Sequence, residues 1–280
     1  MTKNGSTVCL LTIVTGLLMI SVSGDEPVKN DITARRNELM KSKVLAFEIT
    51  SKVDGFPSAF EGKPIFRYND PARSYVAAAI WTLGGKGRPR AVITTELHRQ
   101  FRGEPIISYE FLSLTSEPFV LEGNNIQWNP SGTALEFRPV PGAPAPDSLE
   151  RRRLSQMKEI VRRITGVERN VGQEYELRIM PQPIARYSPS ESEASDGGIF
   201  LVAFGTNPEV ILFLESDGKT WSYAAGRLSG AAEVSLDIDG KRAWTGAPCR
   251  FEFDADAVYT ADRIGIDIPG IAPDGSELKD

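Results

Sequence analysis

Two arginine–glutamate pairs recur in this sequence at matching positions. Arg67 and Glu96 in the first half correspond to Arg186 and Glu215 in the second, each displaced by 119 residues. A bidentate pair between an arginine and a carboxylate on neighbouring strands would fix the strand register, because both groups are long and directional. One interpretation of these four residues is therefore a structural clamp in each half of the chain.

The two glutamates also allow a chemical interpretation. If the halves are related by a pseudo-twofold axis, Glu96 and Glu215 could approach one another and act as acid and base on a glycosidic bond. That chemistry needs carboxyl groups about 5–9.5 Å apart and one raised pKa. Since no catalytic motif accompanies the pair, no residue is assigned as catalytic, and we expect a binding protein rather than an enzyme.

Aromatic residues also recur in matching order in the two halves, at offsets of 114–119 residues, and could line a groove for a sugar or a peptide. Equally, repeated aromatics indicate two equivalent cores, because large aromatic side chains dominate core burial. The matched set is Tyr68, Trp81, Tyr109 and Trp128 with Tyr187, Phe200, Tyr223 and Trp244. The candidate binding residues are Arg67, Tyr68, Trp81, Glu96, Arg186, Tyr187 and Glu215.

Other chemistry has little support in the sequence. The single histidine, His98, is the only residue around which a Ser-His-Asp arrangement could form, and no nucleophile-elbow motif accompanies it. One histidine and Cys249 cannot supply the four ligands of a structural zinc site. No phosphate-binding glycine motif is present. The sequence thus predicts no metal and no cofactor.

Residues 1–24 have the pattern of a secretory signal peptide. A polar start with Lys3 precedes the 15-residue apolar run VCLLTIVTGLLMISV and small residues near Gly24. Because about 20 apolar residues are needed to span a bilayer, we expect cleavage before Asp25 rather than a membrane anchor. The chain is therefore expected to be exported, either periplasmic or secreted, with no membrane insertion after cleavage.

The net charge of −5 disfavours nucleic acid as a partner, because a polyanion needs a basic surface. The expected partner is a protein or a cell-envelope polymer. The oligomeric state is not predicted.

Matched segments extend over most of the chain and indicate an internal duplication. PIFRY at 64–68 resembles PIARY at 183–187, and further matches keep their order along both halves. Apolar residues at helical spacing predict a helix over 148–165 and a weaker one over 31–45. Strand-like segments follow each helix, separated by turn sequences.

These patterns predict an α+β fold of two tandem repeats, each an amphipathic helix packed on an antiparallel β-meander. The order of elements resembles a cystatin-like or nuclear-transport-factor-like cone, a shape that hosts many functions. The expected boundaries are a first repeat at 25–138, a proline-rich linker at 139–146, a second repeat at 147–254 and a C-terminal strap and tail at 255–280.

The segments PIARY, GGIFLVAFGTNPEVILFLE and WSYAAGRLS, with PVPGAPAP and RLSQMKEI, resemble a group of uncharacterised secreted proteins from planctomycete bacteria. That resemblance covers most of the chain after residue 24 and implies export, but no activity or site residue. Two functions remain open: a noncatalytic exported binding or structural module, and a glycan hydrolase using paired carboxylates.

Overall fold

The computed structural model describes residues 25–278, apart from residue 86, residues 190–194 and residues 250–251. The predicted signal peptide at 1–24 lies outside the described residues. The first elements are α1 (Asp25–Leu45), β1 (Glu48–Thr50), β2 (Phe66–Asp70), the 3-10 turn η1 (Pro71–Arg73), β3 (Tyr75–Leu83), β4 (Ala91–Phe101), β5 (Glu104–Ser113), β6 (Val120–Gly123) and β7 (Ile126–Trp128). They are followed by β8 (Arg138–Pro139), α2 (Glu150–Arg162), β9 (Ile164–Asn170), β10 (Gln173–Ile179), β11 (Ala185–Tyr187), β12 (Asp196–Phe204), β13 (Asn207–Ser216), β14 (Trp221–Arg227), β15 (Glu233–Ile238), β16 (Lys241–Gly246) and β17 (Tyr259–Gly265).

The strands form three antiparallel sheets in the described part of the chain. A five-stranded sheet has the order β17-β5-β4-β3-β2, and a small sheet has the order β1-β6-β7. The nine-stranded sheet has the order β16-β15-β9-β10-β12-β13-β14-β8, with β11 also paired to β12, and it curls into a half-barrel.

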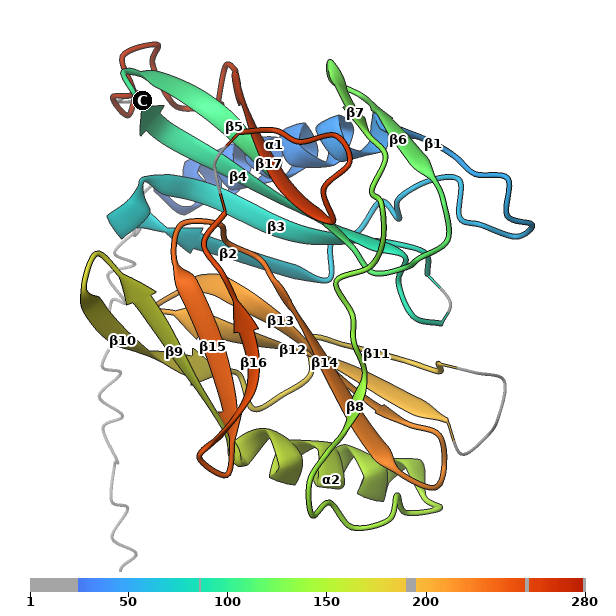
Figure 1. Cartoon of the computed structure of the whole chain (residues 1–280). Coiled ribbons are helices and arrows are strands. Elements are labelled where there is room, and N and C mark those ends of the chain that lie inside the picture. Colours follow the sequence, from blue (N-terminus) through green and yellow to red (C-terminus); the bar gives the residue numbers. More distant parts are fainter. Residues whose placement is uncertain (1–24, 86, 190–194, 250–251, 279–280) are drawn as a thin grey trace, which may run out of the picture.

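The two large sheets stack face to face, with one helix on each outer side. In Figure 1, α1 covers the upper sheet and α2 lies beneath the lower one. Met40 and Val44 of α1 share a core with Trp81 of the five-stranded sheet. Between the sheets, Ile80 and Val92 pack with residues such as Phe213 from the nine-stranded sheet.

Strand periodicity explains how each sheet serves two cores. Successive side chains of a strand point to opposite faces. On β3, Trp81 faces α1, whereas its neighbour Ile80 faces the second sheet. On β12, Phe200 belongs to the core beside α2, whereas Leu201 belongs to the core between the sheets. Both faces of these strands are buried, which is why they are almost continuously apolar.

The predicted α+β fold of two tandem helix-on-meander repeats is wrong. The described protein is mostly β, with 17 strands against two α-helices. Its sheets are not self-contained meanders either: β17, from the predicted C-terminal strap, pairs with β5, and β8 pairs with β14. The edge of a sheet exposes unpaired backbone N–H and C=O groups. Here β17 and β8, which are distant in sequence from their partners, pair with those groups.

Candidate functional site

A polar pocket lies between the two large sheets. Its volume is about 160 Å³, and we call it the inner pocket. It is lined by Arg73, Tyr75, Glu96, His98, Ser108, Glu110, Glu168, Asn170, Asn207, Glu209, Ser229, Ala231, Ala261 and Arg263. Four glutamates therefore surround one small space.

Strand geometry brings these side chains together. Glu96 and His98 are alternate residues of β4, and Ser108 and Glu110 are alternate residues of β5, so all four point towards the second sheet. Glu96 is paired directly with Ser108 in the antiparallel register. The opposite wall comes from the nine-stranded sheet.

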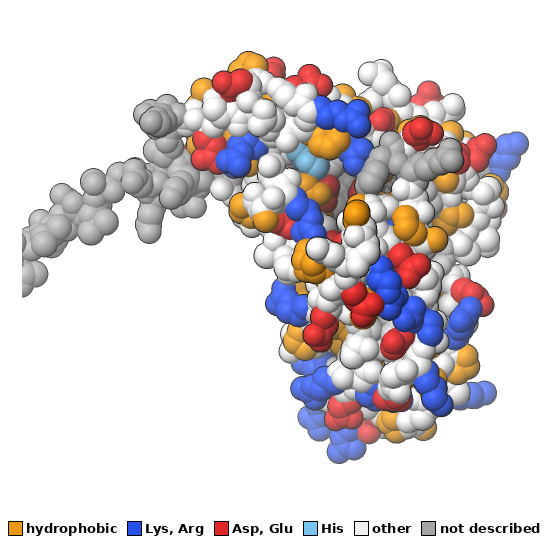
Figure 2. All heavy atoms as spheres, turned by 60° about the vertical axis from the view of Figure 1, so that its left-hand side comes forward, with side chains coloured by type: hydrophobic (Ala, Val, Ile, Leu, Met, Phe, Trp, Pro, Cys, Tyr) orange, Lys and Arg blue, Asp and Glu red, His pale blue; other side chains and the backbone are white. Residues whose placement is uncertain are grey.

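The opposite wall carries Glu168 of β9 and Glu209 of β13. Both glutamates are buried, with only 5% and 2% of their surface exposed. The pocket nevertheless reaches solvent: in Figure 2 the chain's single histidine, in pale blue, is visible on this face among basic and acidic side chains. The glutamates are thus recessed below an opening.

Glu96 is the centre of a hydrogen-bond network. The hydroxyl of Tyr68 donates to its Oε1 at 2.9 Å, and the hydroxyl of Ser108 donates to its Oε2 at 3.0 Å. His98 Nε2 lies 2.8 Å from Ser108 Oγ and 3.4 Å from Glu96 Oε2. In a Ser-His-Asp triad the acid binds the other ring nitrogen. Here the serine and the glutamate contact the same nitrogen, so this cluster does not have the geometry of a triad.

Three buried oxygen atoms of the pocket have no hydrogen-bond donor within the described structure. They are Glu110 Oε2, Glu168 Oε2 and Asn207 Oδ1; the Tyr259 hydroxyl is near enough to Glu110 to lower its pKa but makes no well-formed hydrogen bond of its own among the described residues. The amide of Asn207 is oriented by its nitrogen, which donates to Glu209 Oε1 at 2.8 Å. Buried polar groups are normally paired, and leaving one unpaired costs about 1–3 kcal/mol. Three such acceptors in one pocket indicate a place where donors from another molecule fit.

Burial and crowding raise the pKa values of the pocket carboxyls. The pKa of Glu110 is well above its ordinary value because of burial, followed by the negative charges of Glu96 and Glu209. Burial also raises the pKa of Glu168. Burial, followed by the charge of Glu168, raises the pKa of Glu209 to about 7, although Arg73 acts in the opposite direction. The pocket therefore exchanges protons near neutral pH.

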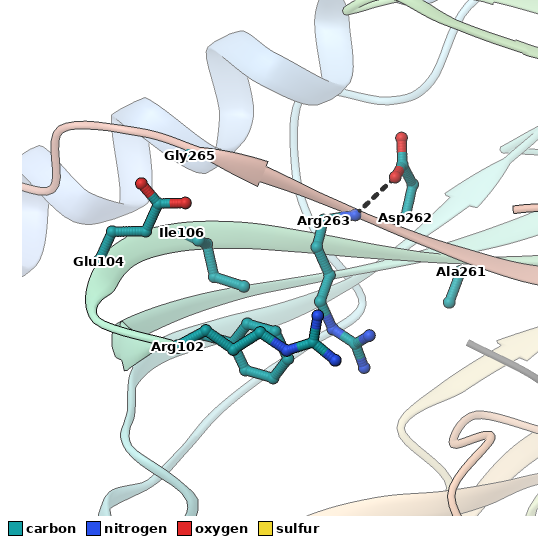
Figure 3. Close-up of a pocket in the computed structure, with 8 residues that line it drawn as sticks. Arg102, Glu104, Ile106, Ala261, Asp262, Arg263 and Gly265 are labelled. Carbon is teal, nitrogen blue, oxygen red and sulfur yellow. Dashed lines mark hydrogen bonds between the residues drawn. The ribbon is translucent and has the colours of Figure 1, made fainter. Parts of the chain in front are cut away.

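An open cavity of about 490 Å³ adjoins the inner pocket, and we call it the outer cavity. The two share Ala261 and Arg263. Figure 3 shows that Arg102, from the turn after β4, and Arg263, from β17, extend side by side in the outer cavity. Their guanidinium groups lie 5.5 and 4.7 Å from the centre of the Phe101 ring. The outer cavity therefore has an apolar wall, the Phe101 ring, with two guanidinium groups beside it.

The predicted Arg67–Glu96 and Arg186–Glu215 pairs are wrong. Arg67 binds Asn37 of α1 instead, at 3.3 Å. Arg186 binds Asp196 and, at 2.9 Å, Glu150 of α2. Each arginine is one residue before a tyrosine that faces the second sheet, so the strand period of two places the arginine on the helix side.

The predicted tyrosines are the actual partners of the predicted glutamates. Tyr68 donates to Glu96, and Tyr187 donates to Glu215 Oε1 at 2.6 Å. Glu215 also accepts both arms of the Arg88 guanidinium, at 2.7 and 2.5 Å. Glu215 does not line the inner pocket, so it cannot act there as the partner of Glu96.

Trp81 is fully buried in the core under α1, and its indole nitrogen donates to Thr95 Oγ1 at 3.0 Å. Of the seven candidate residues, Glu96 alone lines the inner pocket. The sequence interpretation missed His98, Ser108, Glu110, Glu168 and Glu209. Polar residues at every second position of β4 and β5, within otherwise apolar strands, were the available signal for the first three.

The described residues were compared with the requirements of a metal site and of a membrane-spanning helix. Within the described residues, no group of three or more His, Cys, Asp or Glu side chains is arranged to hold a metal ion. None of the helices in the described part of the chain is long and apolar enough to cross a membrane.

Comparison with known proteins gives no relative: no family model, no curated protein and no solved structure matches this chain.

Proposed function

We propose that the protein is an exported, noncatalytic binding module. Its site is the inner pocket together with the outer cavity, and its ligand is a hydrogen-bond-donating group on a protein or a cell-envelope polymer. Export depends on the signal-peptide pattern of residues 1–24 and on the resemblance to secreted planctomycete proteins.

The observation that carries this proposal is the set of unpaired acceptors. Glu110, Glu168 and Asn207 each present a buried oxygen without a donor in the described structure. A bound donor would recover the desolvation free energy of each oxygen, which favours binding of a donor-bearing ligand at this site. The adjoining outer cavity provides room for the rest of the ligand.

The binding test uses two matched substitutions. Ala231→Trp places a large ring at the exposed rim of the inner pocket, whereas Ala145→Trp makes the same change at an exposed residue before α2. Each variant is assayed for co-sedimentation with isolated bacterial cell walls and for crosslinking to envelope proteins. In one of these assays, we expect Ala231→Trp to bind at least about tenfold more weakly than wild type, with Ala145→Trp unchanged. If neither assay shows binding that Ala231→Trp reduces, the proposal is wrong.

A glycan hydrolase remains the second candidate, with Glu110 taking the place of Glu215. The raised pKa of Glu110 favours it, because a general acid must hold its proton near neutral pH. Glu96, on the same sheet face, would be the second carboxylate.

The two candidates differ in the response to Glu110→Gln. A hydrolase would release soluble reducing sugar from the walls, and Glu110→Gln would lower that rate by at least about 100-fold. The binding module predicts no release by wild type.

A further inference from the structure

We infer that the inner pocket holds a terminal primary ammonium group at the end of a flexible stem. This inference rests on the proposed binding function and specifies its ligand. A lysine side chain and an amino sugar both present such a group.

The first argument is the match between donors and acceptors. An ammonium carries three N–H donors and no acceptor. The pocket offers three unpaired buried acceptors, from Glu110 on β5, Glu168 on β9 and Asn207 at the start of β13. They come from both sheets and line the same pocket of about 160 Å³.

The second argument is the charge balance around the pocket. Four glutamates line it, against two arginines and one histidine. The positive charge of Arg73 is shared between Asp70 and the pocket. Its guanidinium contacts Asp70 Oδ2 at 2.5 Å and Glu209 Oε1 at 3.6 Å. When the four glutamates ionise, they outnumber the two arginines, and a cation in the pocket then gains Coulomb energy that a neutral hydroxyl does not.

The third argument is size. Complete ligand pockets usually measure about 300–1,000 Å³. The inner pocket, at about 160 Å³, accepts an end group, and the stem must continue into the outer cavity of about 490 Å³. Phe101 and Ile106 line that cavity and provide apolar contacts for methylenes or a sugar face.

An ammonium would also lower the pKa values that crowding has raised. Its positive charge favours the ionised form of Glu209, whose pKa is about 7, so binding releases protons. The charged and titratable groups around Glu209 in the pocket are Glu168, Glu96, Glu110, His98, Tyr75, Arg73 and Arg263. For a lysine amine, which stays charged over this range, affinity should therefore rise with pH between 6 and 8, by about tenfold for one group titrating near 7.

The test compares amines with their acetylated forms by isothermal titration calorimetry of the full chain. The lysine probes are Nα-acetyl-lysine amide and its Nε-acetylated form; the sugar probes are glucosamine trimer and N-acetylglucosamine trimer. We expect at least one amine to bind at least about tenfold more tightly than its acetylated form. At pH 7 the heats of the lysine probe in phosphate and in HEPES, neither of which is a primary amine, should differ and show release of about half a proton or more. Which amine binds identifies a protein or a polymer as the source.

Variants place the amine in the pocket. Glu209→Gln should reduce amine binding by at least about tenfold and remove most of the pH dependence. Glu168→Gln provides a second test if the first variant does not fold, and the exposed Glu122→Gln on β6 is the matched control that should bind as wild type.

The failures of the inference and of the binding function are distinguishable. If acetylated probes bind as tightly as amines and Ala231→Trp abolishes both, the pocket binds ligands but the ammonium inference is overturned. Absence of binding by every probe also overturns the inference and leaves the wall and envelope assays to judge the function. Amine binding that Ala231→Trp leaves intact overturns the inner pocket as the site, and with it both proposals.

Discussion

Each large sheet has a row of three residues on neighbouring strands: a tyrosine, a small residue and a glutamate that accepts a hydrogen bond from the tyrosine. The two rows differ in the residues around the glutamate. In the five-stranded sheet, Tyr68 reaches across Ala78 to Glu96; in the nine-stranded sheet, Tyr187 reaches across Gly197 to Glu215. Glu215 meets Arg88 from the turn after β3, whereas the pocket that Glu96 lines includes Tyr75 from the start of β3. The two rows therefore face opposite ends of the space between the sheets.

The difference shows how one arrangement serves two purposes. At the Glu215 end, a bidentate arginine neutralises the carboxylate and closes the contact between the sheets. At the Glu96 end, hydrogen bonds from Tyr68 and Ser108 orient the carboxylate, and the neighbouring glutamates leave the space acidic. The first end is a structural clamp and the second is the wall of a pocket.

Removing Arg88 should have the largest effect on stability. Arg88→Ala leaves Glu215, which is 6% exposed, buried without its cation. We expect the free energy of unfolding in urea to fall by about 3 kcal/mol, at the lower end for buried pairs because Arg88 is partly exposed. The control Arg67→Ala, at an exposed site, should change it by less than about 0.5 kcal/mol. Equal effects of the two substitutions would contradict the clamp.

The glutamates of the inner pocket should lower the free energy of unfolding as the pH rises. A carboxyl whose folded pKa is raised binds protons more tightly when folded, so its stabilising effect is complete below pH 4.5 and lost as pH rises towards the folded pKa of about 7. From Glu209 we expect the free energy of unfolding to decrease by about 3 kcal/mol between pH 4.5 and 7.5.

Glu209→Gln isolates this effect, because the amide does not titrate and its oxygen can still accept from Asn207. The variant should be more stable than wild type at pH 8 and should show a flatter profile. A wild-type stability that rises with pH over this range would argue against protonated glutamates in the pocket.

Exchanging the small residue between tyrosine and glutamate should displace the tyrosine at the clamp but not at the pocket. A Cβ added at Gly197 would lie 2.6 Å from the Tyr187 ring, which is held by its hydrogen bond to Glu215. We expect Gly197→Ala to cost about 1 kcal/mol in thermal unfolding and to displace the tyrosine. The reverse change, Ala78→Gly, should cost about 0.5–1 kcal/mol from backbone entropy and about 0.8 kcal/mol more from the lost buried methyl group, with Tyr68 still on Glu96. An unchanged Tyr187–Glu215 contact in a crystal structure of Gly197→Ala would refute this account.

The sequence predicted the antiparallel sheet structure but not its arrangement. The strand-like segments after each helix are predictable because apolar runs bounded by turn residues are typical of strands. The pairing of β17 with β5 joins segments far apart in sequence, so no local sequence pattern predicts it.

The candidate site was predicted in part for a similar reason. The 119-residue spacing drew attention to Glu96 and Tyr68, but spacing does not show which face of a strand a side chain occupies, so the arginines were assigned as partners in place of the tyrosines. Glu168 and Glu209 line the same pocket as Glu110 only because the two sheets stack, and residue spacing in the sequence does not predict which sheets stack.

The most direct test of the account is the titration of the Glu209 side-chain carboxyl by carbon NMR, assigned by comparison with Glu209→Gln. We predict a midpoint near pH 7, which moves lower when the amine that binds in calorimetry is added. A midpoint near 4.5 would contradict the crowded acidic pocket, and a midpoint unmoved by the bound amine would contradict its role as the binding site.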